Sequence, residues 1–75
     1  MYISEEEAKK YPILYKATFT FIYGNKATLD VIKEDKYYYY YIERIEVTED
    51  LPWEPAGTYI ILGKLPKDEI INVEV

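Results

Sequence analysis

The fold is decided by residues 13–23, which read ILYKATFTFIY. Bulky apolar side chains recur at every second position of this segment, so that Ala17, Phe19 and Phe21 share one side of an extended chain. A period of two is typical of a β-strand with one buried face. The segment therefore predicts a strand that packs its odd-numbered side chains against a core.

A second alternating segment, residues 27–32, follows a break at residues 24–26. A two-residue turn between the two strands would place Phe21 opposite Thr28 and split the apolar face. A three-residue loop places Phe21 opposite Leu29 and keeps the apolar side chains together. We therefore expect a hairpin with a three-residue loop.

A third strand is expected over residues 37–48, after a two-residue turn. Its apolar positions change phase between Ile42 and Ile45, which a regular strand with one buried face does not do. One extra residue near Glu43 and Arg44 would restore the match. We therefore expect a β-bulge there, of the kind that bends a long strand in a small barrel.

A short helix over residues 4–10 and two more strands, over residues 58–62 and 70–75, complete the prediction. Residues 4–7, SEEE, form a capping-box pattern, and we expect the helix to lie across the sheet as a lid. Five strands joined mainly by hairpins predict one mainly β domain over residues 1–75. We expect a five-stranded antiparallel, strongly curved sheet or a small SH3-like or OB-like barrel, with one short N-terminal helix.

The residue inventory excludes most enzyme chemistry. The chain has no cysteine and no histidine, and Ser4 is used as a helix cap. Glu43 beside Arg44 is the best candidate for a catalytic carboxylate, but such a neighbour is usually an ordinary ion pair. The dense aspartate spacing of magnesium and calcium loops is absent. We therefore expect no enzymatic activity, no catalytic residue, no cofactor and no metal.

The composition also bears on the source and the compartment. Ten glutamates and eight lysines, with no cysteine or glutamine, follow the pattern of hyperthermophile proteins. The ten tyrosines resemble the usage of small proteins from hot-spring archaea and their viruses. No apolar run approaches the roughly 20 residues of a membrane span, and the acidic start is unlike a secretory signal. We expect a soluble, cytoplasmic protein of a thermophile, with a virus-infected host cell as one setting and no membrane partner.

The most unusual feature is the run of five tyrosines at residues 37–41. Because side chains alternate across a strand, we expect Tyr37, Tyr39 and Tyr41 to form an exposed ladder while the other two enter the core. Two interpretations stay open. The ladder is a binding surface of rigid aromatic rings, or it is an ordinary strand face half-covered by lysine stems and the helix.

A long loop at residues 49–57 holds Trp53 between two prolines. Trp53 either plugs an open end of the barrel, which we favour because a small core needs its large side chains, or it enters a pocket of a partner. The excess negative charge also lies in this part of the chain, at Glu46, Glu49, Asp50 and neighbouring acids. This acidic segment is either a solvated surface or a contact for a basic partner.

Together these features predict a noncatalytic protein–protein interaction module. It self-associates, most simply as a homodimer, or binds a larger protein through its tyrosine-rich sheet face. One alternative is an acidic inhibitor that imitates a nucleic acid and blocks a basic host protein, as a viral anti-defence protein would. A second is single-stranded nucleic-acid binding by aromatic stacking, which the net charge of −5 disfavours. The predicted partner-binding residues are Tyr37, Tyr39, Tyr41, Trp53, Glu46, Glu49 and Asp50.

Overall fold

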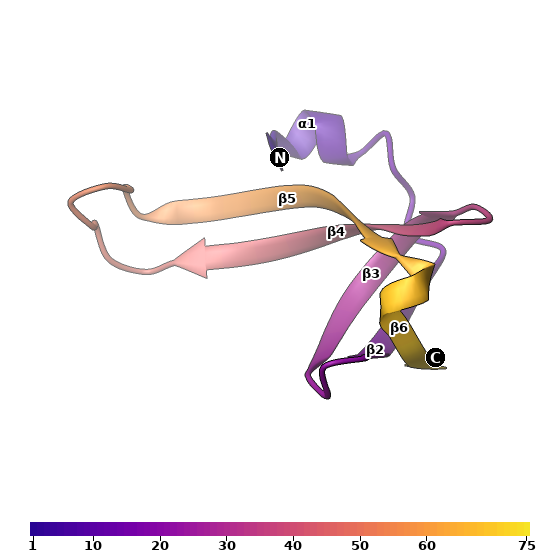
Figure 1. Ribbon diagram of the computed structural model, residues 1–75. Coiled ribbons are helices and arrows are strands. Elements are labelled where there is room, and N and C mark those ends of the chain that lie inside the picture. Colours follow the sequence, from indigo (N-terminus) through magenta and orange to yellow (C-terminus); the bar gives the residue numbers. More distant parts are fainter.

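The computed structural model describes residues 1–75, which form one antiparallel sheet of six strands (Figure 1). The elements in chain order are β1 (Tyr2–Ile3), α1 (Glu5–Ala8), β2 (Tyr15–Phe21), β3 (Lys26–Glu34), β4 (Tyr38–Val47), β5 (Gly57–Pro66), the 3₁₀ turn η1 (Lys67–Glu69) and β6 (Ile70–Glu74). None of the helices has the length and apolar character needed to cross a membrane. The predicted mainly β, antiparallel fold is confirmed.

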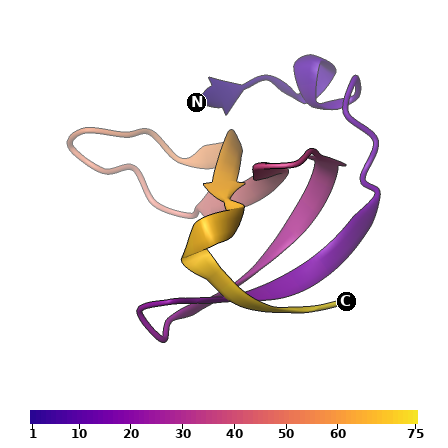
Figure 2. The same cartoon turned by 45° about the vertical axis from the view of Figure 1, so that its right-hand side comes forward.

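The sheet is strongly curved but open. Its strand order is β1-β5-β4-β3-β2-β6, so the meander from β2 to β5 gains one strand at each edge. After η1 the chain returns across the sheet and β6 pairs with β2 (Figure 2). Because β1 and β6 remain edge strands, the prediction of a closed barrel is wrong, and the curved sheet is the form observed. The sixth strand, β1, is too short to show any period in the sequence.

The larger core lies between β2, β3 and the elements that fold over them. Its buried centre consists of Ala17, Phe19, Leu29 and Val31. Leu29 lies opposite Ala17, not opposite Phe21 as predicted, because the turn is centred on Tyr23, two residues earlier in the chain than the predicted loop at residues 24–26. The register differs by an even number of residues, so every inner side chain stays on its predicted face.

A smaller core lies on the opposite face of the sheet, beneath α1. The Ser4 Oγ accepts a hydrogen bond from the N–H of Glu7 at 3.1 Å, as the capping pattern predicts. Ala8 then packs against Ile42 and Ile60. The short helix therefore acts as the predicted lid, and its contribution to burial is a single small residue.

Both cores draw on β4, which is a regular strand. Its pairing with β5 is unbroken along its length, so the bulge predicted near Glu43 and Arg44 is absent. The irregularity lies in β3 instead, where the pairing with β4 shifts at Ile32. Tyr41 packs against the larger core and the next residue, Ile42, lies in the smaller one. The apolar residues of β4 therefore lie on both faces of one regular strand, and Ile45 and Val47 share the face of Tyr41, which accounts for the apparent change of phase.

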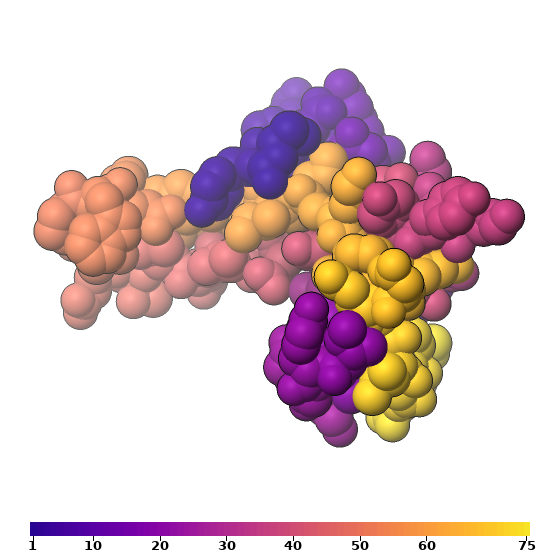
Figure 3. Space-filling model, viewed as in Figure 1, coloured from indigo at the N-terminus to yellow at the C-terminus, as the bar shows by residue number.

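The molecule is extended for its size, and only seven of its 75 residues are buried. Its accessible surface is 5480 Å², whereas a compact protein of this mass exposes about 4,900 Å². Its radius of gyration is 13.7 Å, against about 11 Å for a compact chain of this length. The far end of the β4–β5 hairpin projects away from both cores (Figures 1 and 3). We call residues 46–58 the arm, and none of the seven buried residues lies in it.

Candidate functional site

The arm ends in a tight turn that its own backbone holds. Leu51 and Glu54 exchange two backbone hydrogen bonds, with N to O distances of 2.7 and 3.2 Å. Pro52 and Trp53 therefore occupy the two corners of the turn, and proline favours the first corner because its ring fixes φ. The tryptophan is presented on an ordered turn.

Two further hydrogen bonds brace the loop behind this turn. The Asp50 carboxylate accepts the N–H of Ala56 at 2.7 Å. The Tyr59 hydroxyl donates to the carbonyl oxygen of Pro55 at 2.6 Å. The loop is thus ordered by polar contacts within the arm and with the adjoining Tyr59, and none of its residues is buried in a core.

Trp53 is 78% exposed, so the prediction that it plugs the end of a barrel is wrong. The physical reason is that the sheet is open and its two cores lie elsewhere, while the hairpin carries Trp53 away from both. A large aromatic side chain that its own protein leaves exposed to solvent is the typical anchor of a protein interface. Of the two interpretations of Trp53 from the sequence, the plug is thus excluded, and the anchor for a partner stays a prediction.

The arm carries a concentration of negative charge that no basic residue neutralises. It contains four acids and no base: Glu46, Glu49, Asp50 and Glu54. The three ion pairs of the structure lie outside it. Arg44, the last base before the arm, is held by Glu5 of α1 at 3.0 Å. None of the four carboxylates is in an ion pair, and Asp50 is the one that accepts a hydrogen bond, from Ala56.

An apolar strip follows one face of the β4–β5 hairpin toward the arm. It consists of Tyr2, Ile45, Val47, Tyr59 and Ile61, which the strand register places side by side. The Tyr2 and Tyr59 rings pack edge to face with centroids 5.8 Å apart, yet Tyr2 remains 65% exposed. Sequence reasoning missed this strip because Tyr2 joins it only through β1.

The tyrosine run does not form the predicted exposed ladder. Tyr39 and Tyr41 pack against the larger core, and the Tyr39 ring lies 5.0 Å from the Phe19 ring, centroid to centroid. Tyr37, in the turn before β4, is the member that is well exposed, at 64%. The prediction that Tyr37, Tyr39 and Tyr41 share an outward face, with the other two tyrosines in the core, is therefore wrong.

The irregularity in β3 explains this reversal. Asp35 Oδ1 accepts the N–H groups of Tyr37 and Tyr38 in the turn, each at 2.8 Å, and the pairing next to the turn sets Glu34 opposite Tyr39, which keeps the faces that a two-residue turn predicts. Beyond Ile32 the pairing shifts by one residue, so that Val31 lies opposite Tyr41. A slip of one residue moves every side chain to the other face relative to its partner strand, and Tyr39 and Tyr41 therefore pack against the larger core.

Four lysines gather around the tyrosines at this end of the hairpin. Their Nζ atoms lie over aromatic rings: Lys33 over Tyr40 at 5.1 Å, Lys36 over Tyr37 at 5.5 Å, Lys64 over Tyr38 at 4.4 Å and Lys67 over Tyr39 at 4.8 Å from the centroids. Such contacts occur about once per 70–80 residues in proteins. We call these eight residues the tyrosine–lysine end.

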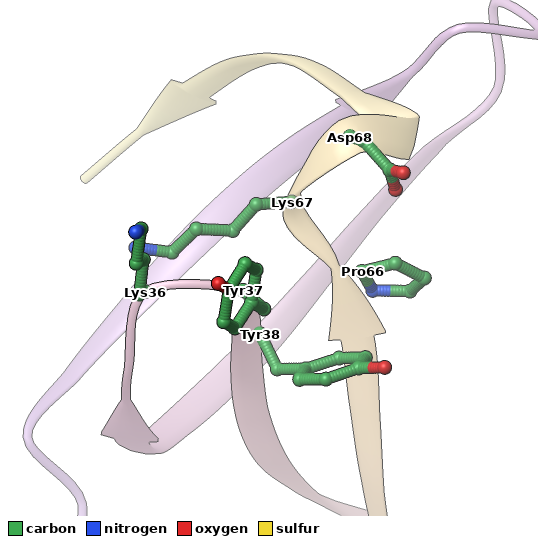
Figure 4. Close-up of a pocket in the computed structure, with 6 residues that line it drawn as sticks. All are labelled: Lys36, Tyr37, Tyr38, Pro66, Lys67 and Asp68. Atoms are coloured by element: carbon green, nitrogen blue, oxygen red, sulfur yellow. The ribbon is translucent and has the colours of Figure 1, made fainter.

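A shallow cavity of about 570 Å³ opens at the tyrosine–lysine end (Figure 4). Its lining comes from the β3–β4 turn with the first residue of β4, and from the end of β5 with η1, and consists of Lys36, Tyr37, Tyr38, Pro66, Lys67 and Asp68. Aromatic and proline surfaces next to two ammonium groups suit an aromatic guest with acidic neighbours. Sequence reasoning did not find this cavity, because residues 66–68 reach it only through the β4–β5 pairing.

A hydrogen-bonded cluster fixes η1 to β3 beside this cavity. Glu34 accepts hydrogen bonds from Lys67 at 2.6 Å and from the Tyr15 hydroxyl at 3.0 Å. These bonds, the one from Lys67 first, lower the pKa of Glu34, and the same pair raises the pKa of Lys67. Burial, followed by the bond to Glu34, raises the pKa of Tyr15 to about 12. The cluster therefore keeps the charges of its ion pair at neutral pH.

The hydrogen bonds of Asp35 predict that acid destabilises the turn between β3 and β4. The N–H groups of Tyr37 and Tyr38, and the Tyr40 hydroxyl at 2.9 Å, stabilise its carboxylate and lower its pKa. Because the pKa is lower in the folded state, this stabilisation is present above the unfolded value of about 3.9 and is lost as the pH falls through the folded value. We expect Asp35→Asn to narrow the difference in urea midpoint between pH 7 and about pH 2. Asp68→Asn, at an exposed carboxylate without a hydrogen bond, is the control, and an equal change in both variants would contradict the prediction.

The structure thus divides the predicted partner-binding residues. Glu46, Glu49, Asp50 and Trp53 share the arm, Tyr37 lies beyond the other end of β4, and Tyr39 and Tyr41 are committed to the larger core. At about 3.3 Å per residue, β4 separates the two surfaces by about 30 Å.

No protein-family model, no curated protein and no solved structure matches the chain.

Proposed function

We propose that this protein is a noncatalytic interaction module that binds a protein partner through the arm. The observation that carries the proposal is Trp53, 78% exposed on a hydrogen-bonded turn, at the tip of an element that holds no buried residue. Tryptophan is enriched among the residues that dominate interface energies. The proposal differs from the sequence-based one in its surface, since the arm replaces the tyrosine ladder.

The surface around Trp53 supports a protein partner. The apolar strip supplies a neighbouring face for packing, and the four arm carboxylates supply orientation and steering. The order within the loop matters as well, because a pre-ordered anchor loses little conformational entropy on binding. The partner expected from this chemistry offers an apolar pocket with basic groups at its rim.

Capture from an extract of the source cells tests the proposal with a matched pair of variants. Trp53→Ala removes the anchor, whereas Tyr23→Ala removes an equally exposed aromatic ring, 77%, from the β2–β3 turn outside the arm. Proteins retained by the native chain should be retained by Tyr23→Ala and lost with Trp53→Ala, because truncating an anchor typically weakens binding by at least about 30-fold. Retention of the same proteins by both variants would contradict the proposal.

An acidic inhibitor of a basic host protein is the second candidate, and the unpaired carboxylates of the arm favour it. In that case charge contributes more than the indole ring, and binding weakens steeply as salt rises. Repeating the capture at raised salt separates the two candidates. Partners that leave at high salt while Trp53→Ala still retains them at low salt would favour the inhibitor.

Single-stranded nucleic acid is the weaker candidate. The tyrosine–lysine end offers rings and cations, but four acids lie among its four lysines: Glu34, Asp35, Asp68 and Glu69. Binding to a phosphate backbone requires a groove with net positive charge. The rings of this end are also engaged by the lysines of the chain itself.

A further inference from the structure

We propose that the arm of one copy of this protein binds the cavity at the tyrosine–lysine end of a second copy, so that the chains associate head to tail. The inference rests on the proposed function, because it uses the arm as the binding element and names a second copy as its partner. Three observations carry it: the charges of the two surfaces, the match between anchor and cavity, and their placement on one hairpin.

The charges of the two surfaces differ in sign at the cavity itself. The arm holds four carboxylates and no base. The lining of the cavity holds two ammonium groups, Lys36 and Lys67, and one carboxylate, Asp68. Lys36 makes no ion pair, whereas Lys67 is paired with Glu34. Over the whole tyrosine–lysine end four acids balance the four lysines, so the attraction for the arm is local to the cavity, with Lys36 as its free cation.

The anchor and the cavity match in chemistry. A volume of about 570 Å³ lies within the usual range of about 300–1,000 Å³ for ligand sites. Its walls include two tyrosine rings and Pro66, and an indole ring is the aromatic group that attracts a neighbouring ammonium group most strongly. Asp68 at the rim offers a carboxylate acceptor for the indole N–H of Trp53, its one polar group.

The placement of the two surfaces makes the contact intermolecular. They are separated by about 30 Å along β4, whose pairing with β5 is unbroken, so that one chain cannot close the contact on itself. A two-fold dimer through the arms would set four carboxylates against four, which like-charge repulsion disfavours. A head-to-tail contact avoids this repulsion and generates open chains or rings.

The size of the two surfaces indicates a weak contact. A standard interface involves about 20–30 residues on each partner. The cavity is lined by six residues, so one junction is small and its association weak. We expect reversible association at high micromolar concentration, weakened by salt.

Two complementary variants test the inference by sedimentation velocity. The arm variant, Trp53→Ala with Glu49→Lys, keeps its cavity; the cavity variant, Lys36→Glu with Tyr37→Ala, keeps its arm. All four positions are exposed, and the far-ultraviolet circular dichroism of each variant checks its fold. The native chain should form species that grow with concentration. Each variant alone should be at least about 30-fold weaker in association, and their mixture should form a one-to-one dimer and nothing larger.

Three results in sedimentation velocity would overturn the inference. The native chain could stay monomeric up to millimolar concentration, or the mixture of the two variants could stay monomeric. The native chain could also form a dimer and nothing larger, with the cavity variant forming the same dimer equally well. Binding of a single-stranded oligonucleotide to a monomeric chain, lost in the cavity variant, would also overturn it. A monomeric chain that still loses its captured partner in Trp53→Ala would overturn the head-to-tail contact and leave the proposed function standing. Retention of that partner by Trp53→Ala would instead overturn the proposed function.

Discussion

Replacing residues 46–58 by an Asn-Gly turn should leave the protein folded and abolish partner binding. Ile45 lies directly opposite Tyr59, so a two-residue turn joins the shortened strands in the same register. All seven buried residues stay in the chain, because none lies in the arm. We expect a free energy of unfolding within about 1 kcal/mol of the native value, measured by urea denaturation, and no capture of a partner.

The shortened chain also separates a structural role of the arm from a binding role. Its circular dichroism and unfolding slope report the fold, and the capture experiment reports the partner. A shortened chain that unfolds much more easily would show that the arm supports the cores. A folded shortened chain that still captures the partner would place the binding surface elsewhere.

The second large effect is expected at Phe19. Its side chain is fully buried at the centre of the larger core, against the ring of Tyr39. Truncation of a buried phenylalanine to alanine costs about 3–5 kcal/mol. At about 0.05–0.15 kcal/mol per residue, a 75-residue chain has a stability of about 4–11 kcal/mol. Phe19→Ala should therefore lower the urea midpoint strongly or leave the chain unfolded.

Phe21→Ala and Tyr23→Ala provide the graded controls for this prediction. Phe21 is on the same face of β2 and only partly buried, and Tyr23 is exposed in the turn that follows. The loss of stability should fall from Phe19 to Phe21 to Tyr23. An unchanged midpoint in Phe19→Ala would show that the larger core does not hold the fold together.

The sequence was informative where a local pattern acts alone. The inward face of β2 and β3 follows from a period of two, and the cap at Ser4 follows from a hydrogen bond within one turn of chain. Register was harder, because the apolar pattern also fits a turn centred two residues later than the observed one, which is centred on Tyr23. Its parity survived, and with it the identity of the core residues.

The candidate site was harder to predict because it depends on contacts between distant segments. The face of each tyrosine relative to the core residues of β3 depends on the one-residue shift in the pairing at Ile32. The exposure of Trp53 depends on where the hairpin ends relative to both cores, which no local pattern reports. The cavity needs Pro66 beside Tyr38, a pairing that forms only in the assembled sheet.

One feature of the sheet links the arm to everything else in the molecule. The strands that carry the arm, β4 and β5, also supply Ile42 and Ile60 to the smaller core, and Tyr41 and Leu65 pack on the larger one. A force applied at Trp53 would therefore be carried along β4 and β5 to both cores, because the two strands are covalently continuous with the arm.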